Sequence, residues 1–209
     1  AMPRTMLNDQ HWSKLLAIFR HFNIYLKLNL RNFIEAILFR IRTGCPWRDL
    51  PQEFGKSNSI FKKYNRWSKN SKFMNIFKLF SQHADKEWIF IDGSHVRAHQ
   101  HSAGIKNQSI SKSIGGNSSK IHLAIDSNGN PIEFIISDGT SHDIKVAPDL
   151  VSKLDLTESE MLCADKGYDS ESFRKKIRES NTKANIPRRS NAKSSNDHMD
   201  WYMYKIRHL

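Results

Sequence analysis

Large apolar side chains recur every three or four positions in the first third of the chain. This spacing holds through residues 9–22 and again through residues 32–43, and it places the apolar residues on one face of a helix. Asp9 is the expected cap of the first helix, and Asn32 with Glu35 resembles a capping box at the start of the second. The first part of the chain is therefore predicted to be helical.

A third helix is expected from Ser57, and it combines an apolar stripe with basic residues. Ile60, Tyr64 and Trp67 fall on one face of this helix. The basic residues lie off that face: Lys62, Lys63 and Arg66. A helix of this kind after a turn is typical of proteins that read a DNA groove. An ordinary surface helix has the same pattern, and both interpretations stay open.

From residue 88 the pattern changes from helical spacing to short apolar runs. Residues 88–91 and 161–164 are unbroken apolar runs, which are typical of strands buried on both faces. Other strands are expected at residues 119–126, 131–137 and 182–187, and helices at 143–154, 170–179 and from 201 onward. The polar residues 93–116 are expected to form a loop, or a strand end followed by a loop.

The predicted order of elements is a three-stranded meander, then a helix, a strand, a helix, a strand and a last helix. A meander followed by crossovers gives a mixed sheet whose first and fourth strands are adjacent and parallel. This is an α/β, ribonuclease H-like sheet with flanking helices. The chain is thus divided into a helical domain at 1–87 and a ribonuclease H-like domain at 88–209.

Both unbroken apolar runs are followed by an aspartate, Asp92 in the first and Asp165 in the second. In α/β sheets, ligands bind just outside the carboxyl ends of the strands. Two carboxylates that converge there repel each other unless a cation joins them, so a hard divalent metal ion is the expected occupant. The sequence therefore predicts a metal-dependent phosphoryl-transfer site.

The charge of the chain indicates a polyanionic partner. The net charge is +12 and the pI is about 9.8, which favours nucleic acid first and an acidic membrane surface second. Residues 1–87 hold 16 Lys and Arg against 6 Asp and Glu, whereas residues 88–209 hold 17 against 15. A basic module therefore precedes a nearly neutral one, with a basic solvated surface as the alternative interpretation.

Composition argues against membrane and zinc proteins. No apolar stretch approaches the ~20 residues of a membrane span, and the start of the chain lacks a signal-peptide pattern, so a cytoplasmic protein is expected. Cys45 and Cys163 have no CxxC spacing. His95, His99 and His101 lack further ligands at zinc-site spacing and are expected to face DNA or solvent.

The remaining acidic and basic residues have structural interpretations. Asp126, Asp138 and Asp143 lie in or beside turns, where aspartate forms local hydrogen bonds, and Asp169 is the expected cap of the helix that follows it. A basic set near this helix could contact a DNA backbone or form a solvated helix face: Arg174, Lys175, Lys176, Arg178, Lys183, Arg188 and Arg189.

Five segments in order resemble the DDE-class transposases of bacterial insertion sequences, in the family numbered five within the family-four-like superfamily. They read ILFRIRTGCPWRDLPQEFG, IDGSHVRAHQHSAG, GGNSSKIHLAID, ADKGYDS and IPRR. The resemblance implies a ribonuclease H-like core in which Asp92 and Asp165 hold Mg²⁺ or Mn²⁺.

The resemblance also implies the partners of the chain. The helical domain would bind the terminal inverted repeats of the element in double-stranded DNA, the catalytic domain would act on those ends and on a target site, and self-association on DNA and association with the nucleoid are further expectations. Candidate DNA-binding residues in the second part are Lys112, Lys120, Lys166, Arg188, Arg189, Tyr204 and Arg207.

The third carboxylate of the family is a glutamate in the pattern Tyr-x-x-Arg-x-x-x-Glu. Tyr204 and Arg207 match its first two members, and the glutamate would fall two residues beyond Leu209. The chain is therefore expected to be C-terminally truncated and nearly inactive in strand cleavage by itself. A DNA-binding remnant without catalysis is one alternative. A ribonuclease H-like nuclease that is not a transposase is the other, and the N-terminal match disfavours it.

Overall fold

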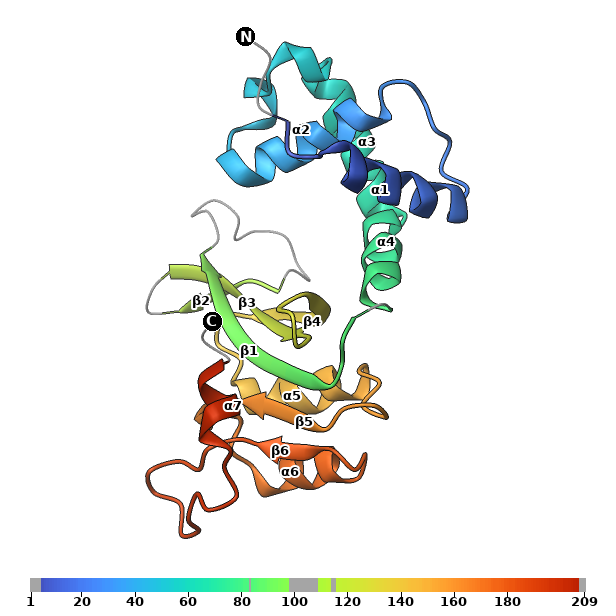
Figure 1. The fold of residues 1–209 in the computed structure, drawn as a ribbon. Coiled ribbons are helices and arrows are strands. Elements are labelled where there is room, and N and C mark those ends of the chain that lie inside the picture. Colours follow the sequence, from blue (N-terminus) through green and yellow to red (C-terminus); the bar gives the residue numbers. More distant parts are fainter. Residues whose placement is uncertain (1–4, 83, 98–108, 114–115, 207–209) are drawn as a thin grey trace. The chain divides into compact units, whose positions relative to one another are not determined.

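The computed structural model divides the chain into two compact units, Ala1–Leu79 and Phe80–Leu209. The residues that the structure describes are 5–82, 84–97, 109–113 and 116–206. Figure 1 shows helices in the first unit and a sheet with helices in the second. No helix in these described ranges is long and apolar enough to cross a bilayer.

The first unit is helical, as its spacing predicts. Its elements are α1 (Asp9–His21), α2 (Leu30–Thr43), the short 3₁₀ helices η1 (Trp47–Asp49) and η2 (Gln52–Phe54), α3 (Ser57–Lys69) and α4 (Lys72–Ser81). Trp67 of α3 lies at the centre of the core, with its ring centroid 5.9 Å from that of Phe19 and 5.1 Å from that of Phe33. Edge-on aromatic packing of this kind fixes the three longest helices against one another.

Both helix caps predicted for this unit are wrong. The cap of α1 is Asn8, whose Oδ1 accepts the N–H of His11 at 2.7 Å, while Asp9 pairs with Arg31. The second helix begins at Leu30, before the predicted capping box.

Glu35 has a different role from the capping one predicted for it. Its side chain is buried, and its two oxygens accept the N–H groups of Met6 and Leu7 at 2.7 and 2.9 Å. Two backbone donors satisfy this carboxylate, so a charged residue can lie inside the unit. It ties the segment before α1 to α2.

The second unit contains a six-stranded mixed sheet. The strands are β1 (Trp88–Arg97), β2 (Ser111–Ser113), β3 (Gly116–Ile125), β4 (Pro131–Asp138), β5 (Met161–Ala164) and β6 (Lys183–Asn185). The order is β2-β3-β1-β5-β6, and β4 also pairs with β3. The pairs β1–β5 and β5–β6 are parallel and the others are antiparallel. The predicted parallel neighbours, residues 88–92 and 161–165, are confirmed.

Of the two interpretations of residues 93–116, a strand end followed by a loop is confirmed at its start, whereas the loop is wrong at its end. The first strand continues to Arg97 because it stays paired with β3 as far as Ser118, and residues 111–113 form β2 on the other side of β3. An antiparallel pair can carry solvent-exposed polar residues, so the polar composition of this segment hides a strand extension.

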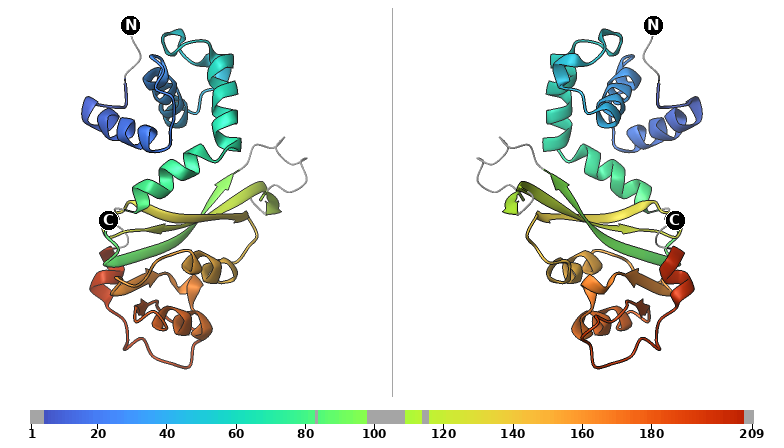
Figure 2. Two further views of the ribbon diagram at one scale, coloured as in Figure 1. Left: turned by 90° about the vertical axis from the view of Figure 1, so that its right-hand side faces the viewer. Right: turned by 90° about the vertical axis from the view of Figure 1, so that its left-hand side faces the viewer.

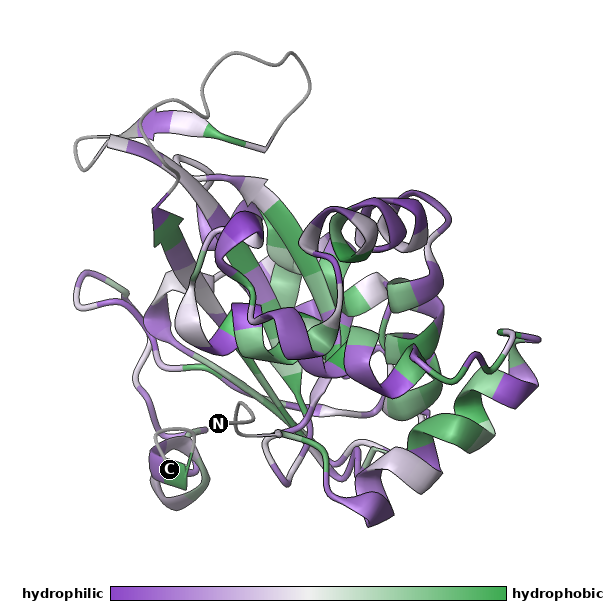
Figure 3. Cartoon of the chain, turned by 90° about the horizontal axis from the view of Figure 1, so that it is seen from above, coloured by the Kyte–Doolittle hydropathy of each residue, from purple (hydrophilic) through white to green (hydrophobic). Residues whose placement is uncertain are grey.

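Residues 89–91 of β1 and the four residues of β5 are buried on both faces, as their apolar runs predict. Ile89, Ile91 and Leu162 belong to the core that α5 (Asp143–Ser152) and α6 (Glu171–Arg178) cover. The alternate residues Phe90 and Cys163 pack on the other face with α7 (Trp201–Ile206). Figure 2 shows this layering from two sides, and in Figure 3 hydrophobic residues gather in the middle of the sheet and on the helices beside it, while the outer strand ends and most connecting loops are hydrophilic.

Candidate active site

Asp92 and Asp165 directly follow paired residues of two adjacent parallel strands. The β1–β5 ladder ends at the pair Ile91 and Ala164, so the aspartates are the next residues of their strands. Neighbouring strands lie about 4.8 Å apart. Beyond this point β1 continues along β3 to Arg97, whereas β5 ends. The two strands therefore separate at the aspartates.

The two carboxylates have different surroundings. Asp165 caps the 3₁₀ helix η4 (Lys166–Tyr168), since its Oδ1 accepts the N–H of Gly167 at 2.8 Å. Asp92 is exposed, and its carboxylate makes no hydrogen bond or ion pair with the residues that the structure describes. Both residues therefore retain carboxylate oxygens that a cation or a water molecule can use.

A third carboxylate, that of Asp143, lies beside this pair. Its Oδ2 accepts a hydrogen bond from Lys120 Nζ at 2.7 Å, and the Tyr168 hydroxyl donates to its Oδ1 at 3.4 Å. His122 Nδ1 lies 3.2 Å from the same Oδ1, but outside hydrogen-bond geometry. The local turn role predicted for Asp143 is therefore wrong, because its partners come from β3 and η4.

The local role is confirmed for the other two turn aspartates. Asp126 Oδ1 accepts the N–H groups of Asn128 and Asn130 at 3.0 and 2.7 Å. Asp138 Oδ1 accepts the N–H of Thr140 at 2.9 Å. These two carboxylates stabilise the turns in which they lie.

Two glycines leave the space that Asp143 fills. A Cβ atom on Gly93 would lie 2.1 Å from Asp143 Oδ1. A Cβ atom on Gly167 would lie 2.9 Å from Asp165 Oδ1 and 3.6 Å from Asp143 Oδ2. The Asp143 side chain therefore lies against the residue after Asp92 and beside the turn that begins at Asp165.

The hydroxyl of Tyr168 lies in the electric field of all three carboxylates. Burial, and then the negative charges of Asp143, Asp92 and Asp165, raise the pKa of its hydroxyl far above its ordinary value. The hydroxyl is therefore protonated at any physiological pH and remains a hydrogen-bond donor. Three carboxylates from three elements thus act on one buried phenol.

Positive charge at this site comes from Lys120, which is nearly buried. It is a predicted DNA-binding residue, and the structure places its ammonium group on Asp143. Burial lowers the pKa of His122 although Asp143 opposes the shift, so the imidazole is neutral near pH 7. Its Nε2 lies 2.8 Å from Ser137 Oγ.

The alternation of buried and half-buried positions along β3 is a sequence signal for Lys120 and His122. Ser118, Lys120 and His122 occupy the same buried face as Ala124. Polar side chains at the buried positions of an alternating strand need specific partners. This pattern predicts a buried polar partner for Lys120 and His122, and that partner is Asp143.

The donor set at the sheet edge fits a hard divalent cation. Carboxylate oxygens suit Mg²⁺, which needs few protein ligands because it keeps several of its waters. Among the described residues, no group of three or more His, Cys, Asp and Glu side chains is arranged to hold a metal ion. Asp92 and Asp165 are the two that offer free oxygens, because Asp143 is neutralised by Lys120.

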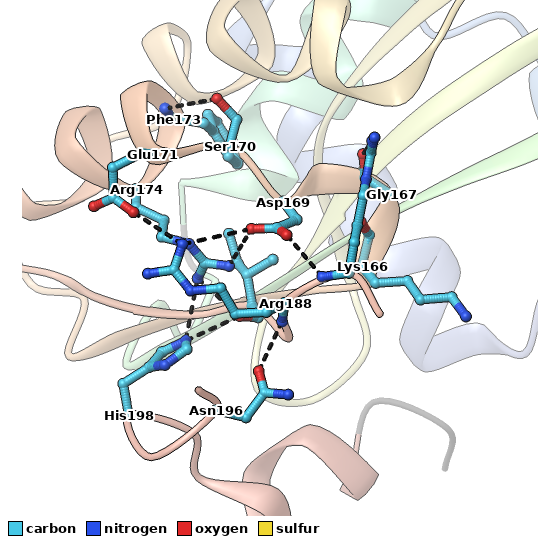
Figure 4. Close-up of polar contacts among 12 residues, drawn as sticks. Lys166, Gly167, Asp169, Ser170, Glu171, Phe173, Arg174, Arg188, Asn196 and His198 are labelled. Carbon is cyan, nitrogen blue, oxygen red and sulfur yellow. Dashed lines mark hydrogen bonds and ion pairs between the residues drawn. The ribbon is translucent and has the colours of Figure 1, made fainter. Parts of the chain in front are cut away.

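Asp169 is the centre of a network of arginines, shown in Figure 4. Its Oδ1 accepts a hydrogen bond from Arg174 Nη2 at 2.7 Å, and its Oδ2 accepts the N–H of Arg189 at 2.7 Å. The cap of α6 is instead Ser170. Arg174 is buried and donates to the carbonyl of Ile186 at 2.7 Å, so it is neither a DNA contact nor part of a solvated face.

This network supports the turn that carries Asp165. The Arg189 guanidinium donates to the carbonyls of Lys166 and Gly167, both at 3.3 Å. Burial alone would raise the pKa of Asp169, but the hydrogen bonds from Arg189 and Arg174 outweigh it and hold that pKa below its ordinary value. The ionised carboxylate thus joins the segment after β5 to the segment after β6.

The other candidate DNA-binding residues of the second unit lie in several places. Lys112 on β2 and Lys166 in η4 are exposed, and Tyr204 lies half-buried in α7. Arg188 is half-buried and donates to Glu171 Oε2 at 3.0 Å. Three predicted residues lie outside the described ranges: His99, His101 and Arg207. His95 is exposed on β1.

In the first unit, the three basic residues of α3 have different environments. Lys62 and Arg66 are exposed, whereas Lys63 is half-buried. Its Nζ lies 4.2 Å from the centroid of the Phe33 ring and 5.6 Å from that of Trp67. The side chain of Lys63 therefore packs on the aromatic core and does not extend into solvent.

Both units match models of known protein families. Residues 83–206 match the family model described as "Transposase DDE domain", which is more than half of the 209 residues. The chain belongs to the DDE transposase family. Residues 7–77 match a second model, described as "Putative transposase of IS4/5 family". The predicted family and its ribonuclease H-like, mixed α/β fold are confirmed.

One curated relative is "Uncharacterized protein y4sN" of Sinorhizobium fredii (strain NBRC 101917 / NGR234). The two sequences are 38% identical over 80 residues, which is 38% of this chain and 64% of the relative. The match therefore spans less than two thirds of the relative's length.

Solved structures of transposases are distant neighbours of this chain. The piggyBac transposase synaptic complex with hairpin DNA has a TM-score of 0.36 at 16% identity, over 84% of this chain and 37% of that one. The Mos1 transposase paired-end complex with left transposon end has a TM-score of 0.34 at 8% identity, over 88% of this chain and 69% of that one.

Gly93→Ala should destabilise the second unit, because the new methyl group would overlap the Asp143 carboxylate. Overpacking of this kind costs about 1–3 kcal/mol, and thermal unfolding of the full chain measures it. Ser94→Ala is the matched control, because Ser94 is exposed on the same strand and should unfold like the parent chain. Equal unfolding temperatures for both variants would contradict the close approach of Asp143.

Asp169→Asn should destabilise the chain by about 3 kcal/mol at neutral pH, because it leaves buried Arg174 without its carboxylate. The folded pKa of Asp169 lies below its unfolded value of about 3.9, so its contribution is complete above about pH 4 and is lost as the pH falls further.

Denaturant unfolding between pH 2.5 and 7 tests this prediction. The parent chain should lose more stability toward low pH than the D169N variant. Glu158→Gln is the control, because Glu158 is an exposed carboxylate outside the arginine network. A D169N curve parallel to that of the parent chain would refute the assignment.

Proposed function

We propose that the protein is the transposase of a bacterial insertion sequence, and that it binds the terminal inverted repeats and carries out metal-dependent strand cleavage and strand transfer. Membership of the DDE transposase family supports this proposal. The observation that carries it is the placement of Asp92 and Asp165 at the end of one parallel ladder. Two adjacent carboxylates with free oxygens are suited to a divalent cation and a phosphodiester.

In this proposal Asp92 and Asp165 would hold Mg²⁺ or Mn²⁺. Such an ion, when bound, would stabilise the charge that develops at the reacting phosphate and would activate water or a DNA 3′-OH. The other residues prepare the site. Lys120 and Tyr168 hold the Asp143 carboxylate, which in turn lies against Gly93 and keeps the β1 backbone in place beside Asp165.

Two nearby basic groups would act on the DNA itself. Lys166 follows Asp165 and is exposed, so its ammonium can approach a phosphate as a point charge. Arg189 is exposed and bound to the same turn. Both would position a DNA strand at the carboxylates while the arginine network keeps their backbone fixed.

A third acidic ligand is expected from the family pattern, and two other candidates within residues 1–209, Asp169 and Asp200, are already engaged. Asp169 is bound by arginines, and Asp200 Oδ1 accepts the N–H of Met203 at the start of α7. We therefore propose that residues 1–209 bind metal weakly and cleave DNA slowly by themselves. A DNA-binding remnant without catalysis is the alternative function.

DNA binding is assigned chiefly to the first unit, since most of the net positive charge lies there. This unit would recognise the terminal inverted repeats, and its binding to DNA would keep the protein at the bacterial nucleoid. Contacts to DNA phosphates release counterions, so the affinity would fall steeply with salt.

Asp92→Asn and Asp165→Asn should each weaken Mn²⁺ binding to the full chain by about tenfold or more, because each removes one charged ligand. Calorimetry or electron paramagnetic resonance of Mn²⁺ measures the loss. In a chain extended through the expected glutamate, each change should also slow cleavage of DNA by about 10²–10³.

Asp155→Asn is the control for both measurements, because Asp155 is exposed and lies beside Lys86, just before the start of β1 and not at the strand end that carries Asp92. Mn²⁺ binding that survives both site substitutions would refute the metal assignment. DNA binding without cleavage by the extended chain would favour the DNA-binding remnant.

Replacing Lys62, Lys63 and Arg66 together by alanine should weaken duplex DNA binding by about tenfold or more at moderate salt, and should reduce the slope of affinity against salt. Fluorescence anisotropy across a salt series measures both. Lys175 and Lys183 are exposed lysines of the second unit, and Lys175→Ala with Lys183→Ala should have the smaller effect. An equal loss would show that the first unit does not dominate DNA binding.

A further inference from the structure

The first unit contains a cavity of about 310 Å³ that is lined mainly by basic and polar side chains. It lies between the α1–α2 connection, α3 and the start of α4. Its charged or polar lining residues are Tyr25, Lys27, Asn29, Ser59, Lys63, Arg66 and Lys72. None of the residues that line it is acidic. We call it the basic cavity.

The four cations of the basic cavity are brought together from three segments of the chain. Lys27 lies between α1 and α2, Lys63 and Arg66 lie one turn apart on α3, and Lys72 begins α4. None of the four forms an ion pair with an acidic residue in the described part of the chain. Their mutual repulsion is therefore a cost that the fold itself leaves uncompensated.

Lys63 experiences this repulsion most directly. Burial, and then the positive charges of Arg66, Lys27 and Lys72, lower the pKa of its ammonium group. The Phe33 and Trp67 rings hold that ammonium in place through cation–π contacts. Lys72 Nζ also lies 5.7 Å from the Trp67 ring centroid. The cations are thus positioned before any ligand arrives.

We propose that the basic cavity binds one phosphate group of a DNA backbone. Its lining contains the side chains that most often contact DNA phosphates, namely lysine, arginine, serine, asparagine and tyrosine. A single anion among four cations would relieve their repulsion and pair with charge-assisted hydrogen bonds. Tyr25 is 79% exposed, so its hydroxyl is free to donate to the same phosphate.

This inference deepens the DNA binding proposed for the first unit, and it changes the expected role of α3. The sequence pattern assigned Lys62, Lys63 and Arg66 one common role. Their positions indicate different roles, because Lys63 and Arg66 line the basic cavity and Lys62 does not. The phosphate would be bound at a fixed point, which sets the register of the unit on DNA, whereas Lys62 would add general attraction only.

The test compares two double variants of the full chain with the same charge change on the same helix. The cavity variant is Lys63→Gln with Arg66→Gln. The control is Lys62→Gln with Lys69→Gln, and both of these lysines are exposed and absent from the lining. Inorganic phosphate is the first probe, with thermal unfolding and the fluorescence of the tryptophans, which include Trp67 in the cavity wall, as readouts. Duplex DNA across a salt series is the second probe.

Phosphate should stabilise the parent chain and the control saturably, and should have no such effect on the cavity variant. The cavity variant should bind DNA about tenfold or more weakly than the control, since it removes two charge-assisted hydrogen bonds to the bound phosphate. Its salt slope should be smaller by about 0.9, which corresponds to one phosphate.

Three results would overturn the proposal. One is the absence of a saturable phosphate effect in the parent chain, and another is an equal loss of DNA affinity in cavity variant and control. The third is loss of the phosphate effect with DNA affinity unchanged, which would assign the cavity to a free phosphate ion. If the parent chain binds no DNA, the proposed function itself fails, which is a separate result.

A second variant keeps the test decisive if the first one fails to fold. Lys63 packs on the aromatic core, whereas Lys27 is exposed and Lys72 begins its helix. Lys27→Gln with Lys72→Gln should therefore fold normally and should show the same losses of phosphate and DNA binding. Normal binding of both ligands by this folded variant would also overturn the proposal.

Discussion

Repulsion between carboxylates is the constraint that organises the second unit. Asp92, Asp165 and Asp143 all act on the hydroxyl of Tyr168, and three like charges near one buried group are costly. The fold compensates one of them internally, through the Lys120 ammonium at 2.7 Å from Asp143. The other two are left at the sheet edge with free oxygens. The same arrangement that stabilises Asp143 thus leaves the charges of the remaining pair without a partner among the described residues.

The sequence predicts the elements that carry this pair, because unbroken apolar runs identify strands buried on both faces and the order of elements makes two of them neighbours. It does not predict Asp143, since the Lys120 contact joins β3 to α5 across 23 positions and depends on which way each side chain points. The capping box at Asn32 failed for a related reason. Local spacing is compatible with a cap, but the buried Glu35 carboxylate instead accepts the N–H groups of Met6 and Leu7, 29 and 28 positions away in the chain.

Asp169 shows the same limit of local pattern. An aspartate before a helix is a common cap, and Ser170 takes that role because its hydroxyl lies one position closer to the helix. Asp169 is thereby free to join Arg174, Arg189 and the turn after Asp165. Arg174 was expected to contact a DNA backbone or to lie on a solvated helix face, whereas the structure buries it. Its carboxylate partner, five positions earlier in the chain, is what makes that burial possible.

The parallel ladder between β1 and β5 also determines when the site can exist during folding. The antiparallel pairs β1–β3 and β3–β4 join segments that are close in sequence, whereas Asp92 and Asp165 are 73 positions apart (165 − 92). Contacts between distant segments form late, because a long loop must close first. During synthesis the helical unit is complete well before β5 emerges. A nascent chain therefore acquires its basic first unit before Asp92 and Asp165 come together, and under the proposed function it would engage DNA before a metal ion.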